Sequence, residues 1–555
     1  MFFTEARLNK RKYRGKVIVF VVFGCITMLT GCSRANIEAP NRGWNIWGFA
    51  NKEEKRNNTF TATTPIVMDT TQYSYYDEPS FHEKVKASFH SQYKSIYRST
   101  YQEEAYQEIQ TLIKKNNYST DYPLLIQNPY GTNASGLYVY MGNLSEDIRL
   151  FYTVAVENEA IPDFTETMYI NKTVSEAVEG QIVGLIPGQY NKLVLELRDA
   201  TGNQISERAY LLYVPENEAT IAPNVAVVQS KTNQDSRGLF QILVQNENKD
   251  AFYLFYDNNG ILRSQIPSKV SDLTAKILQV GNRLFYECSD NVFVLVDNMG
   301  RVVKFYHYKK GLNLVDYAYD EINHKVLFLA KNPESKDVEV VVQLDLKTKE
   351  WDTRLKLSDL VIDTKRFFLC NIQIINGKDI IVCSRSLSSV FRINNIYVKP
   401  VIRWIIGDER QWKDSKYESM LLYEIGDSTT KSSLDSVKYV YSKGLDRGQL
   451  VLSLIDYNNP SNQPGNKIPS QNTHFRKYLL DEYHNQYWIM QQLEVSPHTQ
   501  NCSALLYGNH VIFGLGDEQE IIEYNEKGEI LLRMRFPIKN SSYYINKDTM
   551  DRYWF

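Results

Sequence analysis

Histidine is the residue type best suited to covalent and acid–base chemistry near neutral pH, because a neutral imidazole can attack an electrophile and shuttle protons. None of the histidines in this chain belongs to a Ser/His/Asp motif, and at least two lie in short polar turns (EINHKV and GNHVIF). We therefore expect solvated or locally hydrogen-bonded histidines rather than a catalytic group. The eight are His82, His90, His307, His324, His474, His484, His498 and His510.

Cysteine is the second residue type with chemistry of its own, as a nucleophile or a metal ligand. Two of the six cysteines, Cys25 and Cys32, fall in the N-terminal segment, and none of the others forms a CxxC pair. A zinc ribbon or a thioredoxin-type site is therefore unsupported, and we predict no metal site and no cofactor. The other four occur in apolar, strand-like runs and are expected to be buried free thiols, with a disulfide as the alternative: Cys288, Cys370, Cys383 and Cys502.

Arg385 is a charge inside an otherwise apolar strand, IIVCSRSLSSVFRI. An unpaired charge that faces a core would be costly. We predict that Arg385 instead faces a channel filled with water or an anion, and a salt bridge to a neighbouring unit is the alternative.

The N-terminal segment has the pattern of a targeting signal. A basic region that ends at Lys16 precedes an apolar run over residues 17–30, and Leu29-Thr30-Gly31-Cys32 closes that run. Fourteen residues are short for a membrane-spanning helix, and the basic flank is typical of a signal peptide. Small residues before a cysteine resemble the processing box of bacterial lipoproteins. We predict a signal peptide (1–31), a lipid on Cys32 and a protein anchored to the cell membrane that faces outside the cytoplasm; a short uncleaved anchor is the alternative.

Composition limits the class of protein. Lys and Arg total 63 and Asp and Glu total 65, so the formal net charge is −2, which argues against a nucleic-acid partner. The chain is 43% hydrophobic and 23% charged over 555 residues, enough for a large folded core. The 39 tyrosines favour strands.

The elements that must position any site follow from hydrophobic periodicity. Residues 32–78 are polar and read as a tether. Apolar residues then recur every three or four positions over residues 79–118, which predicts an amphipathic helix. From Leu124 the period becomes two, and six short strands within residues 122–215 predict a small β-sandwich.

Residues 224–555 carry an internal repeat of strand, turn and strand. The copies cover residues 238–266, 275–308, 314–357, 367–407, 437–496 and 502–536, and the first two contain Asp-Asn-Asn-Gly and Asp-Asn-Met-Gly turns. Six such units predict a six-bladed β-propeller with a central channel, and two stacked sandwiches are the alternative. The predicted fold class is all-β: a six-bladed β-propeller preceded by a small β-sandwich and an N-terminal amphipathic helix.

Several segments resemble the bacterial arylsulfate sulfotransferase family. They are LLIQNPYGTNASGLYVYM (124–141), VGLIPGQYNKLVLELRDATGN (183–203), VFVLVDNMGRVVKFYHY (292–308), GKDIIVCSRSLSSVFRI (377–393) and RWIIGDERQW (403–412). The resemblance implies a sandwich and a propeller outside the cytoplasm. It also implies nucleotide-independent transfer of a sulfuryl group from a phenolic sulfate ester to another phenol, through a histidine nucleophile.

The chain departs from the family pattern at the catalytic positions. The family's nucleophilic histidine corresponds to Ser436, and of its His-x-Asn only Asn371 remains, while Arg385 matches the family's arginine. The resemblance therefore implies Arg385 and Asn371 as catalytic residues. Ser436, Tyr439 and Tyr441 are the candidate channel residues. The chain is thus a divergent member in which the catalytic histidines are not matched.

Three functions stay open from the sequence. The first is sulfuryl transfer by a rearranged centre, and the second is a non-catalytic propeller that binds phenolic or anionic ligands or a protein partner. The third is a structural surface protein. We predict weak or absent turnover with ligand binding retained, a phenolic sulfate or other small aromatic anion as partner, and membrane attachment through Cys32.

Overall fold

The computed structural model describes residues 67–69, 96–142, 144, 148–170, 177–214, 225–230, 237–245, 250–271, 276–308, 312–331, 339–360, 369–426, 431–457, 472–495, 502–516, 518–536 and 545–555. All of them belong to one unit, Pro65–Phe555. The predicted signal peptide, Cys32 and most of the predicted tether lie outside the described residues. In the described part of the chain, none of the helices has the length and apolar character that a membrane crossing requires.

Helix α6 (Ser99–Lys115) lies within the predicted helical segment, whose first half, residues 79–95, is not described. Gln102, Ala105 and Ile109 recur every three or four positions and are buried, so they form one face. Ala105 and Ile109 pack with Tyr138 and other core residues of the first sheet. The helix is therefore held by the apolar residues Ala105 and Ile109 and by Gln102, whose buried amide donates to the backbone oxygens of Ile96 and Tyr130.

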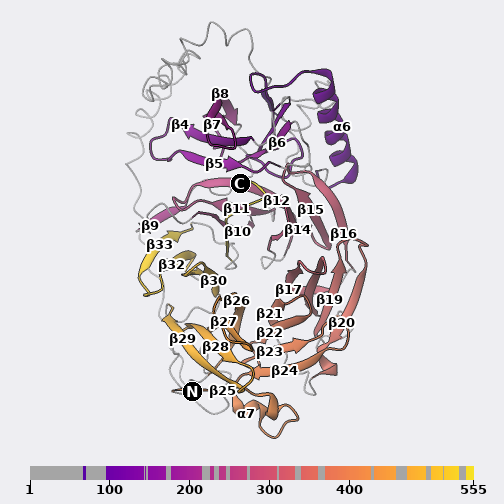
Figure 1. The fold of residues 1–555 in the computed structure, drawn as a ribbon, viewed down its shortest axis with the longest axis vertical. Coiled ribbons are helices and arrows are strands. Elements are labelled where there is room, and N and C mark those ends of the chain that lie inside the picture. The colour runs from indigo at the N-terminus through magenta and orange to yellow at the C-terminus, as the bar shows by residue number, and fades with distance from the viewer. Residues whose placement is uncertain are drawn as a thin grey trace, which may run out of the picture. The chain divides into compact units, whose positions relative to one another are not determined.

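Two four-stranded sheets have the strand orders β1-β2-β3-β6 and β5-β4-β7-β8. Figure 1 labels β4 to β8 of these sheets in purple. The short strand β1 pairs in parallel with β2, although the sequence predicts a tether there; pairing at a sheet edge needs only backbone groups, not an apolar pattern. The strands are β1 (Val67–Asp69), β2 (Leu124–Gln127), β3 (Leu137–Gly142), β4 (Arg149–Val156), β5 (Phe164–Met168), β6 (Ala177–Ile182), β7 (Gln189–Arg198) and β8 (Gln204–Val214).

The rest of the described chain forms six successive sheets whose repeated-unit strands pair antiparallel with their neighbours. This confirms a nearly all-β fold of small antiparallel sheets. The strands are β9 (Ala226–Ser230), β10 (Leu239–Gln245), β11 (Ala251–Tyr256), β12 (Leu262–Ser268), β13 (Leu278–Val280), β14 (Arg283–Ser289), β15 (Val292–Asp297), β16 (Val302–His307), β17 (Asn313–Asp320), β18 (Lys325–Lys331), β19 (Glu339–Asp345), β20 (Trp351–Lys356), β21 (Leu369–Ile375), β22 (Asp379–Ser384), β23 (Ser389–Asn394), β24 (Val401–Ile406), β25 (Tyr423–Glu424), β26 (Leu434–Val440), β27 (Gln449–Asp456), β28 (His474–Asp481), β29 (Gln486–Glu494), β30 (Cys502–Tyr507), β31 (His510–Leu515), β32 (Glu520–Tyr524), β33 (Ile530–Arg535) and β34 (Asn546–Asp548).

The sheets at the two ends of this series exchange strands. The first sheet has the order β12-β11-β10-β34, so the last strand of the chain completes it. The last sheet has the order β30-β31-β32-β33-β9, so a strand from before the repeats completes that one. Between them lie β13-β14-β15-β16, β17-β18-β19-β20, β21-β22-β23-β24 and β25-β29-β28-β27-β26. Three short helices, η2 (Leu357–Asp359), α7 (Glu409–Trp412) and η4 (Glu418–Met420), occur in the connections.

Recurrent turn chemistry explains the repeat. The Asp257 carboxylate accepts hydrogen bonds from the backbone N–H groups of Asn259 and Ile261, and Gly260 has a φ of +72°. The Asp297 turn repeats this arrangement, with N–H groups of Met299 and Arg301 on one carboxylate oxygen. Such turns require an Asx side chain and a residue that tolerates positive φ, and they return the chain into the next strand.

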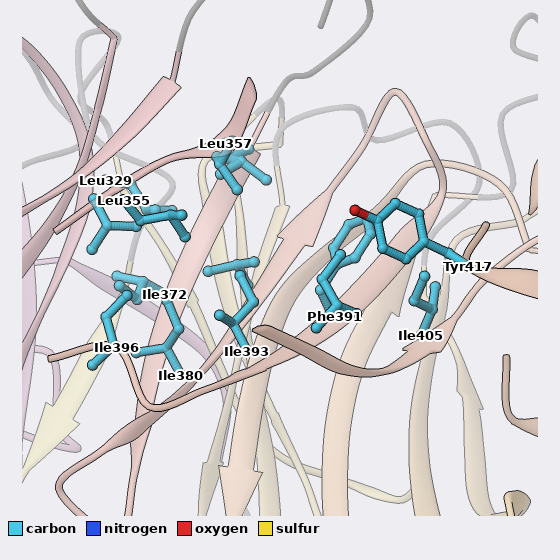
Figure 2. Packing of buried hydrophobic residues seen from close by; sticks show 14 of the residues in the cluster. Leu329, Leu355, Leu357, Ile372, Ile380, Phe391, Ile393, Ile396, Ile405 and Tyr417 are labelled. Atoms are coloured by element: carbon cyan, nitrogen blue, oxygen red, sulfur yellow. The ribbon is translucent and has the colours of Figure 1, made fainter. Parts of the chain in front are cut away.

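Hydrophobic side chains between neighbouring sheets form the core. Figure 2 shows the cluster in which Leu329 and Leu355 of one sheet lie with Ile372, Ile380 and Ile393 of the next. Ile372 and Ile380 are fully buried. Removing such a side chain costs about 2–5 kcal/mol, so these contacts fix the strand ends that carry the polar groups described next.

Candidate functional site

The first strands of several neighbouring sheets begin close together. β17 contacts β21, β21 contacts β26, and β26 contacts β30. Polar and sulfur side chains from these strand starts, and from the ends of β22 and β27, meet at this end of the sheets. We call five of them the Arg385 site: Cys370, Cys383, Arg385, Asp435 and Tyr457.

Arg385 directly follows β22 and bridges to the next sheet. Its Nε donates to Asp435 Oδ2 at 2.6 Å, and its Nη2 donates to the same oxygen and to the Tyr457 hydroxyl, the latter at 3.2 Å. The guanidinium carbon lies 4.7 Å from the centroid of the Tyr457 ring. In the described part of the chain nothing accepts a hydrogen bond from Nη1. The salt bridge to a neighbouring unit, which the sequence left open, is thus present.

The charges of this pair are only partly removed from water. The Arg385 side chain is 24% exposed and that of Asp435 is 9% exposed. Burial would lower the pKa of the Arg385 guanidinium, but the Asp435 carboxylate and the other neighbouring groups outweigh it and raise that pKa. Arg385 therefore carries a permanent positive charge, and Asp435 neutralises it.

Tyr457 connects this pair to a third sheet. It follows β27, and its hydroxyl donates to the backbone oxygen of Cys502 at 2.7 Å and accepts from the backbone nitrogen of Cys502 at 3.2 Å. Burial raises the pKa of Tyr457, and the Asp435 carboxylate raises it further. Tyr457 is therefore a neutral phenol, held as a platform beneath the guanidinium.

Ser436 contributes its backbone rather than its side chain. Its N–H donates to Asp435 Oδ1 at 2.5 Å, and its φ of +50° marks the irregular pairing of β26 between Asp435 and Lys438. Ser436 thus orients the carboxylate that holds Arg385.

Tyr439 lies farther along β26, and Tyr441 lies just beyond its end. Tyr439 packs partly buried against the core between two sheets, and Tyr441 follows the end of β26 with 76% of its surface exposed. Tyr441 is six residues beyond Asp435, roughly 20 Å of extended chain. The structure therefore does not bring either tyrosine into the Arg385 site.

Two cysteines lie beside the ion pair. Cys370 sits at an irregular pairing of β21, between the pairs Leu369–Ser384 and Asn371–Cys383. The Cys370 thiol lies 3.5 Å from the backbone oxygens of Cys383 and Leu434. The sulfurs of Cys370 and Cys383 and a carboxylate oxygen of Asp435 lie within 4.8 Å of one another. Burial, followed by the neighbouring Cys383, raises the pKa of Cys370, so it is a thiol rather than a thiolate.

Asn371 belongs to a second polar chain. Its Nδ2 donates to Asp316 Oδ2 at 2.7 Å, and Lys276 Nζ donates to Asp316 Oδ1 at 2.6 Å. Asn371 is 2% exposed, and its Oδ1 has no hydrogen-bond partner among the described residues. Its amide nitrogen is therefore committed to Asp316 and does not join Arg385.

Five histidines fall in the described part of the chain. His307 and His324 are exposed, and His484 is hydrogen-bonded to Asp481. His510 Nδ1 lies 2.7 Å from Glu523 Oε1, and burial lowers the pKa of His474. No described histidine has a recorded contact with Arg385, Asp435 or Asn371. His82, His90 and His498 lie outside the described residues.

Sequence reasoning identified Arg385 but missed its partners. Asp435 and Tyr457 are 50 and 72 residues away in the chain. Nothing in the local pattern marks Asp435, which lies just before the fifth repeat copy at 437–496, although a salt bridge to a neighbouring unit requires a carboxylate. One sequence feature did mark Tyr457. It directly follows an apolar strand-like run in the repeat copy at 437–496.

Comparisons with known proteins were made with curated proteins, solved structures and family models. No curated protein matches the chain. Among solved structures, similar ones include a 6-phosphogluconolactonase candidate from Bacteroides uniformis, with 10% identity, 73% of this chain and 100% of that chain covered, and a TM-score of 0.34. Another is the WD40 domain of Toxoplasma gondii coronin, with 9% identity and a TM-score of 0.33. That match covers 57% of this chain and 75% of the coronin domain. At these TM-scores we draw nothing from either.

The family comparison covers the Arg385 site. Residues 370–510 match the family model described as arylsulfotransferase (ASST), and this stretch contains Cys370, Cys383, Arg385, Asp435 and Tyr457. Over residues 370–510, the match confirms the resemblance to the arylsulfotransferase family that the sequence predicts.

Proposed function

We propose that this protein is arylsulfotransferase-like and binds aryl sulfates, or related aromatic anions, at Arg385, with family-type sulfuryl transfer weak or absent. The observation that carries the proposal is the state of Arg385 within the family-matching stretch. Asp435 and Tyr457 hold one edge and one face of the guanidinium, while Nη1 is left without a described acceptor.

A sulfonate oxygen suits this free edge. A guanidinium donates charge-assisted hydrogen bonds to planar and tetrahedral anions, and such bonds contribute about 1.5–3 kcal/mol. Asp435 and Tyr457 prevent the side chain from rotating away, so little conformational entropy is lost on binding. The aryl group of the ligand supplies apolar contact beside the tyrosine ring.

Transfer by the family's route requires a histidine. Its imidazole nitrogen forms a bond to sulfur, the ester S–O bond breaks, and the phenolate that leaves takes a proton. No described histidine contacts Arg385, and Ser436 uses its backbone N–H to orient Asp435. A serine without an adjacent base stays protonated near neutral pH. We therefore infer a protein that binds ligand at Arg385 and shows weak or lost sulfuryl transfer. The non-catalytic alternative and the family function would then use the same site.

The architecture that we propose around the site is a closed six-bladed propeller. Three features support it: contacts between successive first strands from β17 to β30, the completion of the first sheet by β34, and the completion of the last sheet by β9. In a closed ring of this kind the first strands line a central channel, and the Arg385 site lies at their starting ends. The ligand then enters from that end.

We further propose that the protein is attached to the cell membrane through a lipid on Cys32 and faces outside the cytoplasm. The basic flank, the short apolar run and Leu29-Thr30-Gly31-Cys32 support this location. A sulfuryl donor that needs no nucleotide suits such a compartment. The balanced charge supports a protein without a nucleic-acid partner.

Calorimetric titration with 4-nitrophenyl sulfate tests the proposed site. Arg385→Gln should weaken binding at least about tenfold, because it removes a charge-assisted contact of about 1.5 kcal/mol or more. The matched control is Arg392→Gln: Arg392 is an ion-paired arginine of the same sheet, bound to Asp379 and Glu482. Asp379 starts β22 and lies six residues from Arg385, roughly 20 Å of extended chain.

The two variants separate a binding role from a structural one. Unchanged binding in Arg392→Gln together with weakened binding in Arg385→Gln supports the proposal. Equal affinity in the wild type and Arg385→Gln would show that the anion binds elsewhere.

A further inference from the structure

Three ligand-type atoms converge from three strands next to Arg385. Cys370 lies in β21, Cys383 in β22 and Asp435 in β26, and their sulfur and carboxylate atoms lie within 4.8 Å of one another. We propose that these three side chains bind a thiophilic divalent cation, with Zn²⁺ as the natural one. This metal site uses three residues of the Arg385 site, but the proposal does not depend on aryl sulfate binding there.

The donor set suits zinc. Two thiolates and one carboxylate are three protein ligands, which leave one open position in a tetrahedral site. Zn–S bonds of about 2.3 Å place two tetrahedral sulfurs roughly 3.8 Å apart. The ligand atoms lie within 4.8 Å of one another, so a modest side-chain rotation on fixed strands can bring them to this spacing. The sequence predicts no metal site because Cys370 and Cys383 are thirteen residues apart rather than in a CxxC pair.

Charge favours a divalent ion. The Cys370 thiol donates to the backbone oxygen of Leu434, and Asp435 is balanced by Arg385. When a divalent cation binds, two S–H bonds break, two metal–sulfur bonds form, and both protons pass to the buffer. The net charge of the buried group is then unchanged, and no oxidant or reductant is needed.

Arg385 orients the carboxylate and leaves it able to coordinate. Asp435 Oδ2 accepts from Arg385 and Oδ1 accepts from the Ser436 N–H. A carboxylate has about four lone-pair sites, and Arg385 Nε, Arg385 Nη2 and the Ser436 N–H use three of them, so a metal can use the one that remains on Oδ1. Hydrogen-bonded partners of this kind commonly fix the direction of a metal-bound carboxylate.

Cys288 provides a control for the proposed metal site. Cys288 is buried, and its thiol lies 3.5 Å from the backbone oxygen of Val292. It is not part of any three-residue cluster of His, Cys, Asp and Glu found in the described residues. Cys288→Ser therefore removes a buried thiol without touching the proposed site.

The experiment titrates the reduced, metal-free full chain with Co²⁺ and follows thiolate-to-cobalt charge-transfer absorption, with Zn²⁺ as competitor. We expect one equivalent of Co²⁺ with two thiolate ligands, displacement by Zn²⁺ and release of two protons. Cys370→Ser and Cys383→Ser should each lose the two-thiolate signal and bind at least about tenfold more weakly, while Cys288→Ser should match the wild type.

A second measurement needs no variant. Zn²⁺ should protect Cys370 and Cys383, but not Cys288, from alkylation in partly unfolding conditions, as peptide masses would show. Absence of the charge-transfer signal in the wild type would overturn the proposal, as would its retention in Cys370→Ser. A Cys370–Cys383 disulfide in protein isolated without reductant would overturn it as well.

Discussion

The ion pair between Arg385 and Asp435 should show strong energetic coupling in a double-mutant cycle. In Arg385→Gln, Asp435 keeps its charge while its side chain is only 9% exposed, and the Ser436 N–H is its one remaining recorded donor. Breaking a buried pair from one side costs about 3–5 kcal/mol. Because Arg385 itself is 24% exposed, we expect the lower end, about 3 kcal/mol.

The reverse change is expected to cost less. In Asp435→Asn the guanidinium keeps its contact with the Tyr457 ring, a cation–π interaction of about 1 kcal/mol, and stays partly hydrated. We expect a loss of about 2 kcal/mol. The double variant Arg385→Gln/Asp435→Asn leaves no uncompensated charge and should lose about 3 kcal/mol, so the coupling energy is about 2 kcal/mol.

Urea unfolding followed by circular dichroism measures the cycle, with the slope checked for constancy across the four proteins. Coupling of about 2 kcal/mol supports a pair that holds the guanidinium in place. Additive losses would refute this reasoning, because they would mean that Arg385 and Asp435 are solvated independently in the folded protein.

Three further predictions concern other parts of the molecule. Burial raises the pKa of Asp297 to about 7, so between about pH 4 and 7 its carboxyl is protonated in the folded state but ionised in the unfolded chain. Stability should therefore fall as pH rises from about 4 to 7, and Asp297→Asn should flatten that fall in melting temperatures measured across this range. Ile380→Ala should cost about 3 kcal/mol in urea unfolding because Ile380 is fully buried, whereas Val398→Ala, at an 89% exposed position, should change stability by less than about 0.5 kcal/mol. Cys32→Ala should leave an unprocessed precursor without incorporated labelled fatty acid, and equal labelling of both proteins would contradict the proposed anchor.

The strands and their turns were largely predictable because their causes are local. In each of the turns Asp257-Asn-Asn-Gly260 and Asp297-Asn-Met-Gly300, the carboxylate accepts a hydrogen bond from the backbone N–H two residues later. The sequence itself therefore marks the turn. Alternating apolar residues mark the strands on either side. A repeat of such units is visible in one chain without any knowledge of contacts.

The composition of the site was predictable only in part, because its contacts are long-range. The charge of Arg385 in an apolar strand indicates that a partner must exist, but no local pattern names Asp435 or Tyr457. The sequence places Tyr439 and Tyr441 in the same segment as Ser436, but the strand ends at Val440, before Tyr441. The irregular pairing between Asp435 and Lys438 shifts which side chains of the strand face the site. Tyr441, beyond the strand, is exposed to solvent.

The most direct test of the central claim combines binding and chemistry in one experiment. The full chain is incubated with 4-nitrophenyl sulfate and an excess of acceptor phenol, while nitrophenol release and the intact mass of the protein are followed. The account predicts saturable binding that Arg385→Gln weakens, little or no nitrophenol release, and no added sulfuryl mass on the protein. Rapid release through a sulfuryl adduct on any histidine would contradict it.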